Sequence, residues 1–189
     1  MLNQRIERIL YDREAIAQRV RELGEAITKD YAQGKSARDP HGRPLLLVGV
    51  LRGAMLFMAD LAREIQAEVE FDFISVASYG KGTVSSGQVR LIMDLNVPIL
   101  ERDVLIVEDI VDTGLTWSYL KRSFQARQPS SVRVCALIDK SARREASSTL
   151  DYVGFPLEED AFIVGYGLDY AGLYRNLPFI GTLKPEYIR

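Results

Sequence analysis

The sequence has little of the chemistry on which several enzyme classes depend. Its 189 residues include one cysteine, Cys135, and one histidine, His41. A single cysteine cannot form an internal disulfide, and its place in the apolar segment VRVCALI predicts a buried thiol in a reducing compartment rather than a nucleophile. A single histidine, in the turn DPHG, excludes His-cluster metal sites and Ser-His catalysis as ordinarily built.

Long apolar runs and an excess of either charge are also missing. The longest apolar run, residues 45–51, is far too short to cross a bilayer. The opening stretch MLNQRIERIL lacks the apolar core of a secretory signal. The net charge of −2 is unlike the basic excess of a dedicated nucleic-acid binder. We therefore expect a cytoplasmic protein without a membrane partner, and the charge does not favour a nucleic-acid partner.

What is present is an ordinary globular composition, with 47% hydrophobic and 26% charged residues, which at this length suits one domain over residues 1–189. Asp12 can cap a helix whose apolar residues recur at a spacing of three and four up to Tyr31, with Gly34 available to end it. Further helices are expected at residues 54–66 and 115–127, and strands at 45–50, 69–77, 89–95, 104–108 and 132–138. This alternation predicts an α/β fold with a parallel sheet flanked by helices.

The most informative segment is VLIVEDIVDTGLT, residues 104–116. Its apolar start predicts a strand that is buried on both faces of the sheet. Acids and a small, hydroxyl-rich turn follow, ending in Gly114 and Thr116. Because open α/β sheets bind ligands at the carboxyl ends of their strands, we expect a ligand site here.

The turn has the features of a phosphate cradle. Gly114 permits close approach of the backbone, Thr113 and Thr116 add hydroxyl donors, and the next helix offers free N–H groups at its start. It is not a Walker loop, since the pattern GxxxxGK does not occur. The nearby acids would repel a phosphate unless they face hydroxyls, a protonated base or a metal ion. A phosphorylated sugar meets that demand, because its hydroxyls can donate to Glu108 and Asp109.

The segment at residues 104–116 resembles the signature of a known enzyme family. VLIVEDIVDTGLT resembles the phosphoribosyl-pyrophosphate signature of type I phosphoribosyltransferases, and the chain as a whole is similar to the hypoxanthine-guanine branch of that family. Other matching blocks are LRG at residues 51–53, SYG at 78–80, ALIDK at 136–140 and the stretch from Asp151 to Arg175. The blocks keep the family's order and approximate spacing.

The resemblance implies the type I phosphoribosyltransferase fold, a twisted parallel sheet flanked by helices, with a small hood formed by the C-terminal segment. It also implies a mobile lid loop, which we place at residues 78–88 because SYGKGTVSSGQ is rich in glycine and serine. The implied reaction belongs to purine salvage: hypoxanthine or guanine plus phosphoribosyl pyrophosphate gives IMP or GMP plus pyrophosphate, with Mg²⁺ as cofactor. A homodimer or homotetramer is expected.

The resemblance also assigns roles to individual residues. Those expected to bind the phosphoribosyl group are Glu108, Asp109, Asp112, Thr113, Gly114, Leu115 and Thr116. Those expected to bind pyrophosphate are Leu51, Arg52, Gly53, Ser78, Tyr79 and Arg175. Those expected to bind the purine are Lys140, Phe162, Ile163 and Asp169. Those expected to hold Mg²⁺ are Asp169, Glu108 and Asp109. Asp112 is the candidate catalytic base near purine N7.

Several of these assignments have alternatives. The alternative for Asp112 and Asp169 is a turn-forming aspartate, and that for Arg175 is a surface arginine. The Lys140 ammonium offers only donors, so it suits the exocyclic oxygen of a 6-oxopurine and opposes the amino group of adenine, but an isolated lysine is usually solvated. Phe162 is expected to stack on the purine, or else to pack in the core. Arg52 stands where the family commonly has lysine, which leaves open whether its side chain or its backbone binds pyrophosphate.

Two other functions stay open. One is a xanthine- or pyrimidine-preferring enzyme, because the sequence does not rank hypoxanthine, guanine and xanthine. The other is a regulator that keeps the phosphoribosyl site as a sensor and contacts RNA or DNA through a basic patch of Arg133, Lys140, Arg143 and Arg144. The near-neutral charge and the absence of an added nucleic-acid domain favour the enzyme.

Overall fold

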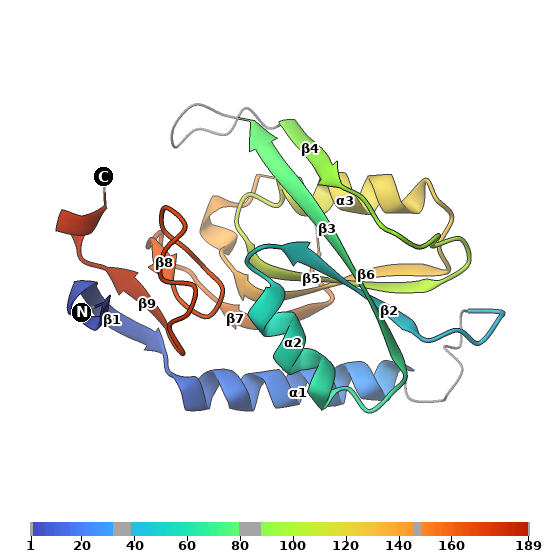
Figure 1. Cartoon of the computed structure of the whole chain (residues 1–189), viewed down its shortest axis with the longest axis horizontal. Coiled ribbons are helices and arrows are strands. Elements are labelled where there is room, and N and C mark those ends of the chain that lie inside the picture. The colour runs from blue at the N-terminus through green and yellow to red at the C-terminus, as the bar shows by residue number, and fades with distance from the viewer. Residues whose placement is uncertain (1, 32–38, 80–87, 146–148, 189) are drawn as a thin grey trace.

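The computed structural model of the protein describes residues 2–31, 39–79, 88–145 and 149–188. Its main feature is a six-stranded sheet in the order β4-β3-β2-β5-β6-β7 (Figure 1). The strands are β2 (Leu45–Leu51), β3 (Val69–Tyr79), β4 (Gln88–Met93), β5 (Asp103–Val111), β6 (Ser131–Asp139) and β7 (Tyr152–Pro156). All pairings are parallel except that of β4 with β3. The predicted α/β fold is confirmed, with an antiparallel strand at one edge.

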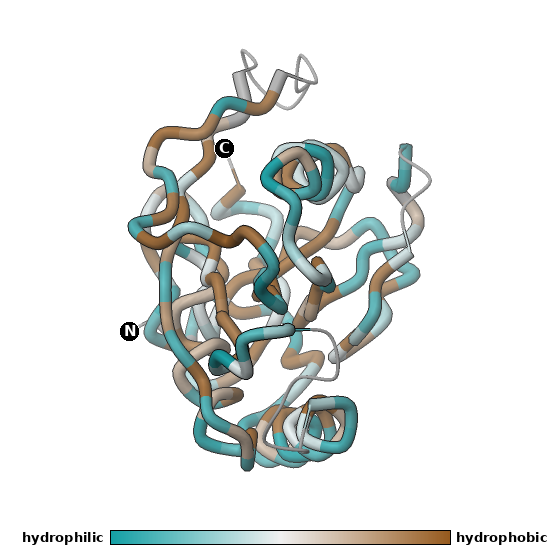
Figure 2. Tube along the Cα trace, turned by 90° about the vertical axis from the view of Figure 1, so that its right-hand side faces the viewer, coloured by the Kyte–Doolittle hydropathy of each residue, from teal (hydrophilic) through white to brown (hydrophobic). Residues whose placement is uncertain are grey.

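Helices cover both faces of this sheet. Along β2, Leu45 and Leu47 pack in one core cluster with α1 (Arg13–Tyr31) and α2 (Met55–Glu64), whereas Leu46 and Val48 pack in a second cluster with α3 (Leu115–Gln125). Successive side chains of a strand point to opposite faces, so β2 is buried on both sides. Figure 2 shows the helices on either side of the strands, and Figure 1 places α1 and α2 together.

The first helix forms as the sequence predicts. Asp12 caps it, because its Oδ1 accepts a hydrogen bond from the backbone N–H of Ala15 at 2.8 Å. The predicted apolar face is buried along its whole length; it comprises Ile16, Val20, Leu23, Ile27 and Tyr31. Gly34, expected to end the helix, lies outside the described residues. Among the helices of the described chain, none is long and apolar enough to cross a membrane.

A second, antiparallel sheet in the order β1-β9-β8 lies at one end of the molecule (Figure 1). It comprises β1 (Ile6–Tyr11), β8 (Ile163–Val164) and β9 (Ile180–Leu183). We call these strands and the chain from residue 163 to 183 the small-sheet region. It is built largely from the segment expected to form the hood, whose closing over a substrate stays a prediction. Short 3-10 helices complete the chain: η1 (Leu2–Arg5), η2 (Ser141–Arg143) and η3 (Pro185–Tyr187).

Candidate active site

The strand order reverses direction between β2 and β5. These two strands are neighbours, but the chain continues from β2 to β3 on one side and from β5 to β6 and β7 on the other. Such a reversal of direction is where open α/β sheets bind ligands, outside the carboxyl ends of the strands. The LRG segment follows β2 and the Asp112–Thr116 turn follows β5. The two segments therefore meet at the sheet edge where the site was predicted.

The LRG segment lies directly against the acids of β5. A side chain at Gly53 would collide with the carboxylate of Asp109, so this position suits a residue without Cβ. The peptide bond between Leu51 and Arg52 is cis. The Arg52 side chain is exposed at the rim. Whether it binds pyrophosphate by its side chain or its backbone stays open.

Two acids of the signature, Glu108 and Asp109, lie within β5, whereas Asp112 follows it. The predicted strand ended at residue 108, but β5 continues to Val111, where it still pairs with Asp139 of β6. The predicted boundary is wrong because the polar residue Asp109 marks the end of the apolar run but not the end of the strand pairing. The side chain of Glu108 is buried, and that residue is 5% exposed.

Burial moves the titration of both acids to higher pH. It raises the pKa of Glu108 well above its ordinary value, and the neighbouring charge of Asp109 raises it further. Burial likewise raises the pKa of Asp109 from 3.8 to about 6, although the N–H of Ile110 and the charge of Arg175 act in the opposite direction. Asp169 adds to the rise. The protein has thus placed two acids where a positive charge or a hydroxyl donor would stabilise their ionised forms.

The turn after β5 has the backbone that the predicted cradle requires, and phosphate binding there stays a prediction. Gly114 takes the left-handed conformation with φ of 80°, and α3 begins at the next residue. The Thr113 hydroxyl accepts a hydrogen bond from the N–H of Leu115 at 3.4 Å. A cavity of about 210 Å³ is lined by residues of this turn and by Glu108. The lining residues are Glu108, Ile110, Val111, Asp112, Thr113, Gly114, Thr116 and Trp117.

The segment after η2 holds this turn in place, which sequence reasoning missed. The Arg144 guanidinium pairs with the carboxylate of Asp139 and its Nε donates to the Asp112 carbonyl at 3.3 Å. The N–H of Glu145 donates to the Thr113 carbonyl at 3.0 Å. Arg144 was weighed only as part of a basic patch. A charged run in a sequence does not reveal which backbone carbonyls it will reach.

Lys140 lies beside the same turn. The backbone N–H of Lys140 donates to the Val111 carbonyl at 3.0 Å, so the end of β6 is joined to the end of β5 next to Asp112. Its ammonium is buried, and Nζ contacts the carbonyl of Ala161 at 3.2 Å and the carboxylate of Asp160 at 2.5 Å. The alternative of a solvated lysine is therefore wrong for this residue.

Phe162 is the residue after Ala161 in the chain. It is 45% exposed, and its ring meets the edge of the Tyr170 ring with centroids 5.3 Å apart. An aromatic side chain this exposed does not serve core packing, so that alternative is wrong. Ile163 is buried and pairs with Thr182 in the small sheet. Stacking of Phe162 on a purine and reading of the purine edge at Ile163 stay predictions.

Asp169 and Arg175 lie together in the small-sheet region. Oδ1 of Asp169 pairs with Nη2 of Arg175 at 2.6 Å, and its Oδ2 accepts from the N–H of Gly172 at 2.7 Å. The second contact matches the turn-forming role that an aspartate often has. Gly167, with φ of 103°, packs against the carbonyl of Gly53. The small-sheet region thus contacts the LRG segment. The candidate site is therefore bordered by the LRG segment, the turn after β5 and the small-sheet region.

The predicted magnesium ligands do not form a compact cluster by themselves. In the described part of the chain, no group of three or more carboxylate, histidine or cysteine side chains is arranged to hold a metal ion. Burial raises the pKa of both Glu108 and Asp109, although the charge of Arg175 acts against the rise at Asp109, so a divalent cation beside either carboxylate would stabilise its ionised form. Mg²⁺ usually takes one or two carboxylates together with substrate phosphate oxygens and water.

Ser78 and Tyr79 close β3 at the same edge of the sheet. Their side chains and most of the predicted lid, residues 80–87, lie outside the described residues, so both assignments stay predictions.

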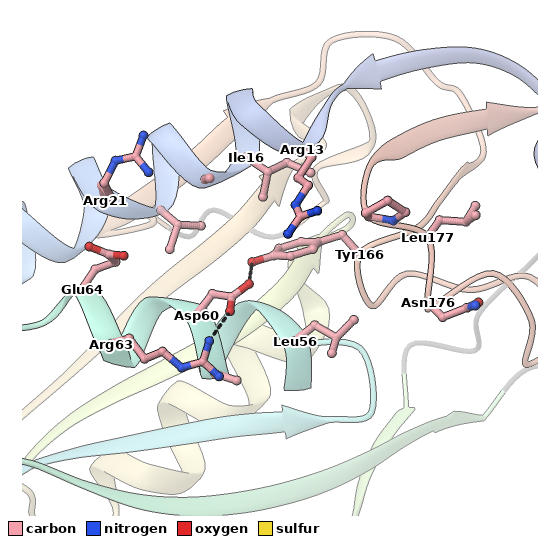
Figure 3. Close-up of a pocket in the computed structure, with 14 residues that line it drawn as sticks. Arg13, Ile16, Arg21, Leu56, Asp60, Arg63, Glu64, Tyr166, Asn176 and Leu177 are labelled. Carbon is pink, nitrogen blue, oxygen red and sulfur yellow. Dashed lines mark hydrogen bonds and ion pairs between the residues drawn. The ribbon is translucent and has the colours of Figure 1, made fainter.

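A second cavity, of about 560 Å³, lies between α1, α2 and the small-sheet region (Figure 3). None of the predicted site residues lines it. At its wall the Tyr166 hydroxyl donates to Oδ2 of Asp60 at 2.7 Å, and Nη1 of Arg63 donates to Oδ1 of Asp60 at 3.1 Å. The cavity is separate from the candidate site, but the bond from Tyr166 attaches the small-sheet region to α2.

The charges of the suggested basic patch are largely engaged within the protein. Arg133 pairs with Asp30 at 2.7 Å, Lys140 with Asp160, and Arg144 with Asp139. The side chain of Arg143 lies outside the described residues. Paired cations attract phosphate less strongly than free ones, so this geometry gives little support to a nucleic-acid surface.

Comparison with known proteins agrees with this geometry. Residues 8–171 match the family model described as phosphoribosyl transferase domain. The chain therefore belongs to the phosphoribosyltransferase family. Within that family, it is 47% identical over 185 residues to the hypoxanthine-guanine phosphoribosyltransferase of Bacillus subtilis strain 168, covering 98% of this chain and 97% of that protein.

Two further relatives point to the same branch. The hypoxanthine-guanine phosphoribosyltransferase of Mycobacterium tuberculosis strain H37Rv is 49% identical over 181 residues, covering 96% of this chain and 88% of that protein. A crystal structure of a hypoxanthine phosphoribosyltransferase from Staphylococcus aureus superposes with a TM-score of 0.90 at 44% identity, covering 100% of this chain and 97% of that one. The fold prediction is thus confirmed at the level of the family.

Proposed function

We propose that the protein transfers the phosphoribosyl group of phosphoribosyl pyrophosphate to hypoxanthine or guanine and releases pyrophosphate, as a purine-salvage enzyme. The observation that carries this proposal is the meeting of three segments at one sheet edge. The LRG segment, the Asp109–Thr116 segment and the Gly167–Arg175 turn are in contact there. The names of the relatives support the same reaction.

The donor side of the site is built by β2 and β5. The turn from Asp112 to Thr116 would bind the 5-phosphate through backbone N–H groups and hydroxyls. Glu108 and Asp109 would accept hydrogen bonds from the ribose hydroxyls. Arg175 and the LRG segment would stabilise the negative charge that develops on pyrophosphate as it leaves. When bound, Mg²⁺ would neutralise charge on the donor, with Asp109, Glu108 and Asp169 as the candidate ligands.

The acceptor side lies between β6 and the small-sheet region. Phe162 would stack on the purine, and the ammonium of Lys140 would donate to its exocyclic oxygen. Asp112 follows the strand beside Lys140, so its carboxylate would lie near N7 and take up or relay a proton as N9 forms its new bond. A homodimer or homotetramer and a cytoplasmic location remain predictions.

The test mixes the purified protein with Mg²⁺, phosphoribosyl pyrophosphate and one nucleobase at a time, and measures nucleoside monophosphate by chromatography. We expect product with hypoxanthine and guanine and little with adenine. Product with xanthine or a pyrimidine alone would establish the alternative enzyme. No product with any base, together with tight and salt-dependent binding of RNA or DNA, would favour the regulator instead.

A further inference from the structure

The ammonium of Lys140 has two partners, and both come from one short segment. Its side chain is 7% exposed, and Nζ lies 2.5 Å from Oδ1 of Asp160 and 3.2 Å from the carbonyl oxygen of Ala161. The Asp160 carboxylate is itself 64% exposed and reaches inward from the surface. Phe162, the candidate stacking residue, follows immediately. One segment thus carries both the stacking ring and the groups that hold the lysine.

The number of donors on the ammonium makes this arrangement specific. A lysine ammonium has three N–H donors and no acceptor. Asp160 and Ala161 account for two of these donors, which leaves one for the exocyclic oxygen of a bound base. A buried ammonium also requires a counter-charge, because taking an unpaired charge out of water is costly. Asp160 is the carboxylate in ion-pair contact with Lys140 in the described structure.

We propose that Asp160 is a positioning residue for recognition of 6-oxopurines, because it neutralises the Lys140 ammonium and aims its remaining donor at the exocyclic oxygen. This inference rests on the proposed function and names a determinant of its base specificity. Asp160 acts through Lys140 and is not expected to touch the base. The neighbouring carboxylate Glu159 provides a contrast, because it pairs with Arg8 at 2.5 Å on the surface.

The first experiment compares Asp160→Asn with Asp160→Glu and with the control Glu159→Gln in steady-state kinetics. The asparagine keeps the size and removes the charge. We expect it to raise KM for hypoxanthine about tenfold, on the order of one strong charged contact, and to change KM for phosphoribosyl pyrophosphate by less than about twofold. Asp160→Glu should recover most of the affinity, and Glu159→Gln should match the wild type.

The second experiment is a double-mutant cycle with Lys140→Ala. If Asp160 acts through Lys140, then Asp160→Asn should have little further effect once the lysine is absent. Three outcomes would overturn the inference. They are the same loss of affinity for hypoxanthine with and without Lys140, an unchanged KM for hypoxanthine in Asp160→Asn, and a parallel rise in the KM values for both substrates. These outcomes are read against the wild type, whose turnover tests the proposed function separately. If the wild type turns over and the effects of the two substitutions on KM are additive, the role of Asp160 is rejected and the proposed function stands.

Discussion

The six-stranded sheet and the small-sheet region position their site residues in different ways. In the large sheet, β2, β5 and β6 pair in continuous parallel register, for example Leu47 with Leu105 and Val107 with Cys135. In the small-sheet region, the chain from Gly165 to Arg175 is mostly turns, and Tyr166 and Tyr174 have φ values of 48° and 75°. Strand pairing fixes the first set of residues, whereas turns, a small apolar cluster that includes Val164 and Leu177, and polar contacts fix the second.

This difference separates the two halves of the proposed reaction. The donor half is supported by strands that are buried on both faces. The acceptor half depends on the single contact of Lys140 with Asp160, and the pyrophosphate end of the donor half depends on that of Asp169 with Arg175. The bond from Tyr166 to Asp60 attaches the small-sheet region that carries Asp169 and Arg175. Substitutions at the strand ends should therefore change turnover in a protein that stays folded. Substitutions in the small-sheet region should change the affinity for substrates or Mg²⁺ and the attachment of that region to α2.

The largest effect is expected from Asp112→Ala. Removing a general base typically costs a factor of about 10² to 10⁴ in rate, so kcat should fall by at least about 10². The far-ultraviolet circular dichroism spectrum and the melting temperature should stay close to those of the wild type, because Asp112 lies in the turn beyond β5. Full turnover in this variant would remove the role assigned to Asp112.

A second expectation concerns the pH dependence of stability. The pKa of Asp109 is about 6 in the folded protein against an ordinary 3.8, so the folded state holds this proton to higher pH than the unfolded chain. Its contribution to stability is therefore present below about pH 4 and is lost as the pH rises through about 6. We expect the free energy of unfolding to fall by about 2 kcal/mol over that range. Glu108 acts in the same direction.

Urea denaturation at several pH values, without Mg²⁺, measures this effect. In Asp109→Asn the decline of the unfolding free energy between pH 4 and 7 should be smaller than in the wild type. An equal decline in both proteins would mean that the burial of Asp109 does not govern the trend.

Asp169→Asn tests the small-sheet side of the comparison. The substitution keeps the shape of the side chain but removes the charge that faces Arg175 and that is a candidate magnesium ligand. We expect the Mg²⁺ concentration for half-maximal activity to rise about tenfold, corresponding to roughly 1.4 kcal/mol. Glu158→Gln, at an exposed position, is the control. An unchanged magnesium requirement would argue against Asp169 as a ligand.

The smallest effect is expected from Tyr166→Phe. It removes the hydrogen bond from the hydroxyl to Asp60 and keeps the buried ring, so the free energy of unfolding should fall by about 1 kcal/mol. Tyr174→Phe, which removes a 3.2 Å contact with Arg5 of η1 and none with α2, is the matched comparison. If only Tyr166→Phe also raises KM for phosphoribosyl pyrophosphate, then the bond to α2 supports the site. Equal effects on KM would show no such link.

The two regions also differ in how far the sequence predicted them. The strands of the large sheet, apart from β7, and all three helices follow from apolar periodicity, which reports burial directly. β1, β7, β8 and β9 were missed. β8 has two residues, β1 pairs with two irregularities in register, and β7 contains a glycine and ends in a proline. Such short or irregular strands carry little periodic signal.

The candidate site shows a similar division. The resemblance supplied the residues, and the strand order brought the segments of residues 51–53 and 108–116 together. The contacts of Arg144 with the Asp112 carbonyl and of Asp160 with Lys140 were not predicted. These partners are 32 and 20 residues apart and are joined only by the fold. No local pattern in the sequence records such a pairing.

The strand order has a consequence for how base preference can change. The residues assigned to the ribose ester lie along the central strands β2 and β5, whereas the segment that holds Lys140 and bears Phe162 lies outside the large sheet, before β8. Residues 157–163 could thus be exchanged for those of a relative that prefers other bases, while the residues assigned to the ribose and its phosphates stay unchanged. Such a graft offers a modular route to new nucleotide products.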